Sequence, residues 1–227
     1  EQVVVMPGAQ CAVYSVAQCL LDPGDEVIVA EPMYVTYEGV FGAIGATVRP
    51  VAVRPENGFR VDPTEVAALI TPRTRALLLN SPNNPSGAVY SADELSALAE
   101  VLRRHPYVLV MADEIYEQFV YAGARHVSLL NVAPDLKQRT LIVNGASKGY
   151  AMTGWRLGFG AGPKWLVLAI GKLLSQTTTC PSSISQAAAV AAFAGDQAPI
   201  AGMREVYAQR RARMLTLLHA VPGLRCT

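Results

Sequence analysis

The chain has 227 residues, of which 51% are hydrophobic and 16% are charged. This composition excludes a disordered chain and is typical of one sizeable globular domain with part of a second. The 19 basic and 18 acidic residues give a formal net charge of +1 without a long run of either sign, so we expect no nucleic-acid partner. The apolar runs are too short and too often interrupted to span a bilayer, so we expect no membrane partner either.

Cysteine and histidine do not form a metal-binding pattern. The four cysteines (Cys11, Cys19, Cys180 and Cys226) lack CxxC spacing and the three histidines are isolated from one another, so we expect no metal site. Unpaired cysteines suit a reducing compartment, and no secretory signal is recognisable, so we expect a cytoplasmic protein. The chain begins with Glu1 directly before a strand-like run, and we therefore expect a further segment upstream.

Strand-like and helix-like segments alternate along the chain. We expect strands over residues 3–6, 26–30, 46–53, 74–79, 107–111, 140–143 and 157–161, and helices over residues 11–21, 63–70, 92–104 and 200–219. This alternation predicts an α/β fold with a mostly parallel sheet that is covered by helices on both faces. Because ligands of such sheets bind beyond the carboxyl ends of the strands, the residues at those ends are the candidates for a site.

A polar loop over residues 144–156 separates two strand-like runs and contains Ser147, Lys148 and Arg156. Lysine is rarely buried unless it is paired or chemically used, and an amine removed from water loses its proton more readily, as a nucleophile requires. If Ser147 and Arg156 bind one anion beside the lysine, the loop could hold the phosphate of a phosphorylated aldehyde while Lys148 forms an imine with the aldehyde. Pyridoxal phosphate is such a compound. A surface loop with an ordinary lysine and a routine arginine ion pair explains this stretch equally well.

Polar side chains also follow the strands that precede this loop. Asn84 lies in the loop after residues 74–79, and Asp113 lies where residues 107–111 end, with Tyr116 three positions further on. A carboxylate beside the ring nitrogen of pyridoxal phosphate keeps that nitrogen protonated, and Asp113 can supply it. Asn84 and Tyr116 can donate to the phenolic oxygen of the cofactor.

Two loops near the start of the chain can complete such a site. Tyr34 can stack on the cofactor ring, and the turn at Gly8, Ala9 and Gln10 places backbone N–H groups at a helix start, where the dipole favours a phosphate. Arg156 can bind the phosphate through two parallel donors. Each of these residues, taken alone, is also explained by a structural role in a turn, a helix cap or the core. For all of them together, that explanation requires several independent coincidences at the same edge of one sheet.

As a set, these motifs resemble the class I and II, fold-type I pyridoxal-phosphate aminotransferases. The matching stretches follow the family's order and cover nearly the whole chain: residues 8–10, 32–37, 80–87, 112–116 and 147–156. The resemblance implies a large domain with a seven-stranded type of sheet over residues 1–198. It also implies an interdomain helix and the start of an incomplete small α/β domain over residues 199–227, with segments missing at both ends of the chain.

The resemblance implies a role for each candidate residue. Lys148 would carry pyridoxal phosphate as a Schiff base and move protons, Asp113 would pair with the pyridinium nitrogen, and Tyr116 would hold the phenolic oxygen; these three are the expected catalytic residues. Asn84 would contact both the cofactor and the substrate carboxylate. The remaining expected cofactor contacts are Gly8, Ala9, Gln10, Tyr34, Ser147 and Arg156.

The implied activity is a ping-pong transfer of an amino group from an L-amino acid to a 2-oxo acid in amino acid metabolism. The first half of the chain is similar to arginine–pyruvate aminotransferases and the second half to bacterial aspartate aminotransferases, so the substrate stays open. A fold-type I lyase and a cofactor-sensing transcriptional regulator with an aminotransferase-like domain are the alternatives. Residues 175–183 resemble the loop that family dimers present to the neighbouring subunit, which implies a homodimer.

Overall fold

The computed structural model describes residues 2–121 and 123–226, and its centre is a seven-stranded sheet. The strands are β1 (Val3–Met6), β2 (Glu26–Glu31), β3 (Thr47–Ala52), β4 (Thr74–Asn80), β5 (Leu109–Asp113), β6 (Thr140–Gly145) and β7 (Gly158–Ala161), in the order β1-β7-β6-β5-β4-β2-β3. Four neighbouring pairs are parallel, whereas β7 is antiparallel to both β1 and β6. The predicted mostly parallel sheet is confirmed.

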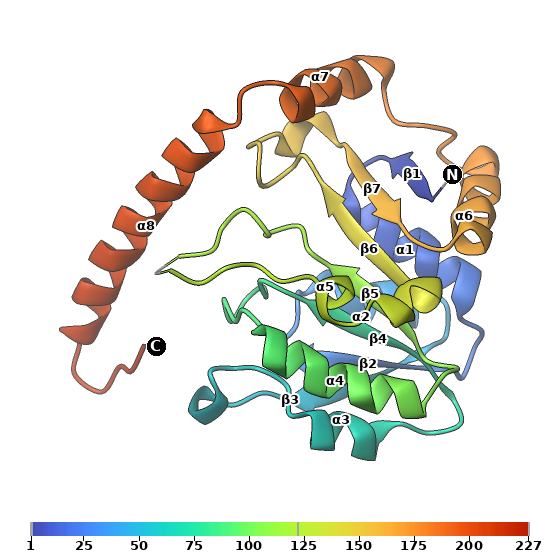
Figure 1. Cartoon of the computed structure of the whole chain (residues 1–227), viewed down its shortest axis with the longest axis horizontal. Coiled ribbons are helices and arrows are strands. Elements are labelled where there is room, and N and C mark those ends of the chain that lie inside the picture. Colours follow the sequence, from blue (N-terminus) through green and yellow to red (C-terminus); the bar gives the residue numbers. More distant parts are fainter. Residues whose placement is uncertain (1, 122, 227) are drawn as a thin grey trace.

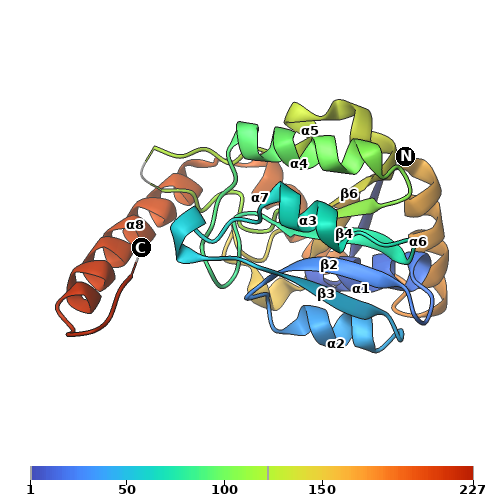
Figure 2. The same ribbon diagram turned by 90° about the horizontal axis from the view of Figure 1, so that it is seen from below.

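Helices cover both faces of the sheet, as Figure 1 and Figure 2 show from two directions. One layer contains α1 (Ala9–Leu20), α2 (Thr36–Gly42) and α6 (Lys164–Gln176), and the other contains α3 (Pro63–Leu69), α4 (Ala92–Arg104) and α5 (Leu129–Val132). Successive residues of a central strand serve the two layers: Leu78 of β4 packs in the first core and Leu77 in the second. Because both faces are buried, the strands read as continuous apolar runs in the sequence.

Two helices follow the sheet. Helix α7 (Ser183–Ala194) packs through Ala189 against Ala146 and Leu157, whereas α8 (Ala198–His219) extends away from the sheet as a long arm (Figure 1). Ile200 is buried, but most of α8 is exposed. The boundary at residue 198 stays a prediction. None of the helices formed by residues 2–121 and 123–226 is long and apolar enough to cross a membrane.

The carboxyl ends of six strands lie at one edge of the sheet. Strands β2, β3, β4, β5 and β6 are parallel, and β1 runs in the same direction as β6 because both are antiparallel to β7. In the register of the sheet, Asn80 of β4 lies beside Asp113 of β5, which lies beside Val143 of β6. The loops after these strands therefore begin side by side, as the α/β topology predicts.

A reciprocal cap fixes the start of α4. The Ser91 hydroxyl accepts from the Glu94 backbone N–H at 3.2 Å, and the Glu94 carboxylate accepts from the Ser91 N–H at 2.8 Å.

We expect Ser91→Ala to lower the free energy of unfolding by about 1 kcal/mol. Ser96 is the matched control, because its exposed hydroxyl only donates to the Ala92 carbonyl, and Ser96→Ala should cost less than about 0.5 kcal/mol. Denaturant unfolding of the complete protein checks this, and equal losses would contradict it.

Candidate active site

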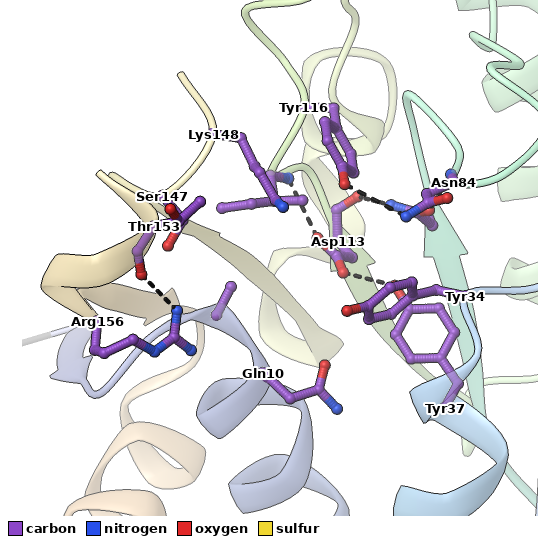
Figure 3. A pocket seen from close by; sticks show the side chains of 13 residues that line it. Gln10, Tyr34, Tyr37, Asn84, Asp113, Tyr116, Ser147, Lys148, Thr153 and Arg156 are labelled. Carbon is purple, nitrogen blue, oxygen red and sulfur yellow. Dashed lines mark hydrogen bonds between the residues drawn. The ribbon is translucent and has the colours of Figure 1, made fainter. Parts of the chain in front are cut away.

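A cavity of about 200 Å³ lies at the edge where the carboxyl ends of the strands meet. Nine of the ten predicted site residues line it: Ala9, Gln10, Tyr34, Asn84, Asp113, Tyr116, Ser147, Lys148 and Arg156. The tenth, Gly8, lies directly behind Arg156. The lining also includes four residues that sequence reasoning did not select, namely Tyr37, Asn80, Ile115 and Thr153. The geometry thus brings together side chains from five separate stretches of the chain (Figure 3).

Asp113 ends β5 and lies at the bottom of the cavity with 7% of its surface exposed. The Tyr37 hydroxyl donates to its Oδ2 atom at 2.6 Å, and the Ile115 N–H donates to its Oδ1 atom at 3.2 Å. Burial raises the pKa of the Asp113 carboxyl, while these two donors oppose the rise. Within the described part of the chain no cation lies within ion-pair distance of Asp113. Such a carboxylate favours a positively charged group in the cavity.

Asn80 connects two sides of the cavity. Its side-chain N–H group donates to the Asp113 carbonyl at 3.0 Å, and its side-chain oxygen accepts from the Asn84 N–H at 2.9 Å. Asn84 in turn donates to the Tyr116 hydroxyl at 3.4 Å. Asn80 therefore fixes the start of the loop that carries Asn84. Its position as a polar residue at the end of a buried apolar strand is the signal that could have identified it.

Lys148 lies three residues beyond the end of β6 and is half-buried. Its Nζ atom lies 5.6 Å from the centre of the Tyr116 ring. A tight turn supports this position, because the Ala151 N–H donates to the Lys148 carbonyl at 3.1 Å and Ala151 takes a positive φ of 53°. In Figure 3 the Lys148 amine and the Asp113 carboxylate face the same space. The two groups can therefore act on one ligand.

The opposite end of the cavity is rich in hydrogen-bond donors. Arg156 adopts the left-handed conformation (φ 50°, ψ 54°), and its Nη1 atom donates to the Thr153 carbonyl at 3.0 Å. Its guanidinium group packs so closely on Gly8 that any Cβ atom there would collide with it. The first turn of α1 and the buried Ser147 face the same end. A positive side chain beside a helix N-terminus is suited to an anion such as a phosphate.

A second group of titratable side chains lies outside this cavity. Glu114, Glu117 and His126 place one ligand atom each within 4.8 Å of one another, and His126 Nε2 lies 3.2 Å from a Glu114 carboxylate oxygen. This contact joins the loop that carries His126 to the end of β5, which explains why the groups converge. His126 looked isolated because the pairing is made in space. The expectation that the chain holds no metal stays a prediction.

The comparison with known families tests the family resemblance that the motifs indicate. The whole chain, residues 1–227, matches the family model described as aminotransferase class I and II. The chain belongs to the class I and II aminotransferases. Enzymes of this family use pyridoxal phosphate, and the resemblance inferred from the motifs is confirmed.

Individual class I and II aminotransferases are similar over the same region. An arginine–pyruvate transaminase of Pseudomonas aeruginosa is 51% identical over 225 residues, which are 99% of this chain and 56% of that protein. An aspartate aminotransferase of Geobacillus stearothermophilus is 44% identical over 99% of this chain and 57% of that protein. The crystal structure of the aspartate aminotransferase from Rhizobium meliloti matches with a TM-score of 0.98 at 44% identity, over 100% of this chain and 56% of that chain. The chain thus spans slightly more than half the length of these relatives.

Proposed function

We propose that the chain forms the cofactor-binding part of an enzyme that moves an amino group from an L-amino acid to a 2-oxo acid with the help of pyridoxal phosphate. The observation that carries the proposal is the convergence of Lys148 and Asp113 on one cavity, with Arg156 and the first turn of α1 at its other end. Family membership supports the same reaction class.

The residues of the cavity fit this cofactor group by group. The buried Asp113 carboxylate, which has hydrogen-bond donors but no cation among the described residues, matches a protonated ring nitrogen. Arg156 and Ser147 match the phosphate. Asn84 and Tyr116, which already share a hydrogen bond, match the phenolic oxygen. Tyr34, Gly8, Ala9 and Gln10 keep the predicted roles of ring neighbour and phosphate-binding turn.

Three residues of the cavity would take part in the proposed reaction. When bound, pyridoxal phosphate supplies an electron sink for the pair left at the substrate α-carbon. Lys148 Nζ would hold the cofactor through its aldehyde carbon, and its free amine would carry the α-proton of the substrate. Asp113 keeps the ring nitrogen positively charged. Asn84 also donates to the carboxylate of the substrate.

Gly158 offers a test of the phosphate-binding end of the cavity. It begins β7 beside Met6, and a Cβ atom there would collide with the backbone of Gly8 and Ala9. We expect Gly158→Ala to displace the first turn of α1 and to weaken binding of pyridoxal phosphate by about tenfold or more. Titration of the apoprotein with pyridoxal phosphate measures this constant.

Gly171→Ala is the matched control, because the position on α6 has open space for a Cβ atom. This variant should bind pyridoxal phosphate like the wild type. If Gly158→Ala and Gly171→Ala bind the cofactor equally well, the close approach of β7 to the α1 turn does not shape the phosphate site.

A half-reaction experiment tests the proposed reaction class. An L-amino acid added alone to the complete protein should convert the bound cofactor to its amine form, and a 2-oxo acid should convert it back. A lyase would release product without accumulating the amine form. L-Aspartate and L-arginine are the donors to test first, because relatives at 44% and 51% identity carry those substrates in their names.

The assembly and the location of the protein are part of the same proposal. We place the boundary between the large domain and the interdomain helix at residue 198, and we propose a cytoplasmic homodimer in which the segment over residues 175–183 approaches the partner subunit. Most residues of this segment are exposed. Light scattering on the complete protein tests the dimer, and a monomer at micromolar concentration would contradict it.

A further inference from the structure

We propose that Tyr37 is a positioning residue for the cofactor, and that it acts through Asp113 by holding the carboxylate in the orientation that faces the cavity. This inference rests on the proposed function. It assigns a role to a buried side chain that sequence reasoning did not select.

The contact between the two residues joins separate parts of the fold. Tyr37 is the second residue of α2 and is 1% exposed, and Asp113 is the last residue of β5. The phenol O–H donates to Asp113 Oδ2 at 2.6 Å across 76 positions of sequence (Figure 3). A hydrogen bond to a buried carboxylate is charge-assisted, and its short length is typical of that class.

The two oxygen atoms of Asp113 are each held by a different donor. Tyr37 binds Oδ2 and the Ile115 N–H binds Oδ1, so the plane of the carboxylate is defined by two points. Without the phenol, the Ile115 N–H alone would hold the group. The carboxylate could then turn away from a cation in the cavity.

The same hydrogen bond keeps the carboxylate ionised. Burial, followed by the charge of Glu114, raises the pKa of the Asp113 carboxyl, whereas the Tyr37 donor lowers it. Removing the phenol O–H therefore shifts this pKa upward and favours the neutral acid, which pairs weakly with a ring cation. Burial, and then Asp113 itself, raise the pKa of Tyr37 well above its ordinary value, so Tyr37 remains a donor at physiological pH.

Tyr37 also contacts the residue proposed to lie against the cofactor ring. Its ring meets the Tyr34 ring edge to face, with centroids 5.6 Å apart and an interplanar angle of 77°. Tyr37→Phe keeps this packing and removes only the hydroxyl group. The substitution therefore isolates the hydrogen bond to Asp113 from the aromatic contact.

Tyr90 provides a matched control in the same chain. It is also buried, at 3% exposed, and its hydroxyl oxygen accepts from the Val61 N–H at 3.1 Å. It lies in the other core layer and does not line the cavity. Tyr90→Phe therefore removes a buried tyrosine hydroxyl and its hydrogen bond without touching Asp113.

The experiment titrates the complete apoprotein with pyridoxal phosphate and measures the dissociation constant. We expect Tyr37→Phe to raise it about tenfold and Tyr90→Phe to change it less than about twofold. The tenfold loss should grow as the pH falls, because the unsupported Asp113 carboxyl is protonated at a higher pH. Besides Tyr37, the titratable groups around Asp113 are Glu114 and Tyr116 from the turn that follows β5, and Tyr34 and Lys148 from two other loops.

A double-mutant cycle separates action through Asp113 from general packing. In an Asp113→Asn background, Tyr37→Phe should change the dissociation constant less than about twofold. An unchanged constant for Tyr37→Phe alone, or the same tenfold loss in both backgrounds, would overturn the inference. If the wild-type protein binds no pyridoxal phosphate at all, the proposed function fails as well, whereas wild-type binding with an insensitive Tyr37→Phe variant overturns the positioning role only.

Discussion

Lys148→Ala is expected to abolish turnover, with a fall in kcat of about 10⁴-fold or more, because one substitution removes the amine that we propose both bonds the cofactor and moves the α-proton. Lys148 is half-buried at the cavity, and its Nζ atom lies 5.6 Å from the centre of the Tyr116 ring. No other lysine lines this cavity among the described residues. Steady-state assays and absorbance spectra of the complete protein provide the measurement.

Two features of the Lys148→Ala variant separate this role from a folding defect. The variant should still bind pyridoxal phosphate, since Arg156, Ser147 and Asp113 remain, but the bound cofactor should no longer be fixed to the protein by borohydride. Lys172→Ala on the exposed surface of α6 is the control and should behave like the wild type. Transamination by Lys148→Ala at the wild-type rate would show that another group does the chemistry.

Asp113→Asn is expected to lower kcat by at least about 100-fold, because an amide of the same shape cannot stabilise a positive ring nitrogen. The native carboxylate is buried at 7% exposure and receives hydrogen bonds from Tyr37 and Ile115. The loss should appear in single-turnover half-reactions at saturating cofactor, which separates the chemical step from cofactor binding.

Asp135→Asn is the matched control for that measurement. Asp135 is an exposed carboxylate that pairs with Arg103 at 2.7 Å, outside the cavity. Its replacement should leave the half-reaction rate unchanged, because exposed ion pairs contribute little and this one does not reach the site. A half-reaction rate for Asp113→Asn within about twofold of the wild type would contradict the pairing of Asp113 with the ring nitrogen.

Most of the cavity lining could be predicted because these residues follow buried strands. The apolar runs that end at Asn80, Asp113 and Gly145 identify neighbouring parallel strands, and in a parallel sheet the loops after them must meet. The residue types that follow then restrict the chemistry. The family resemblance added the individual roles, which spacing alone left open.

Tyr37 and the sheet order could not be predicted from the residues alone. Tyr37 lies on the short helix α2, where the sequence does not say whether a tyrosine enters the core or reaches the end of β5. The insertion of β7 between β1 and β6 depends on pairing between segments more than 150 positions apart, such as Val5 with Phe159. The close approach of His126 to Glu114 is likewise a contact in space. Local patterns carry no information on such long-range contacts.

Mass spectrometry of the borohydride-reduced protein tests the central proposal most directly. The complete protein, loaded with pyridoxal phosphate, would be reduced, digested and mapped for the lysine that carries the phosphopyridoxyl group. We predict modification of Lys148 alone. An unmodified Lys148, or a cofactor fixed instead to Lys137, Lys164 or Lys172, would contradict the assignment of this cavity as the active site.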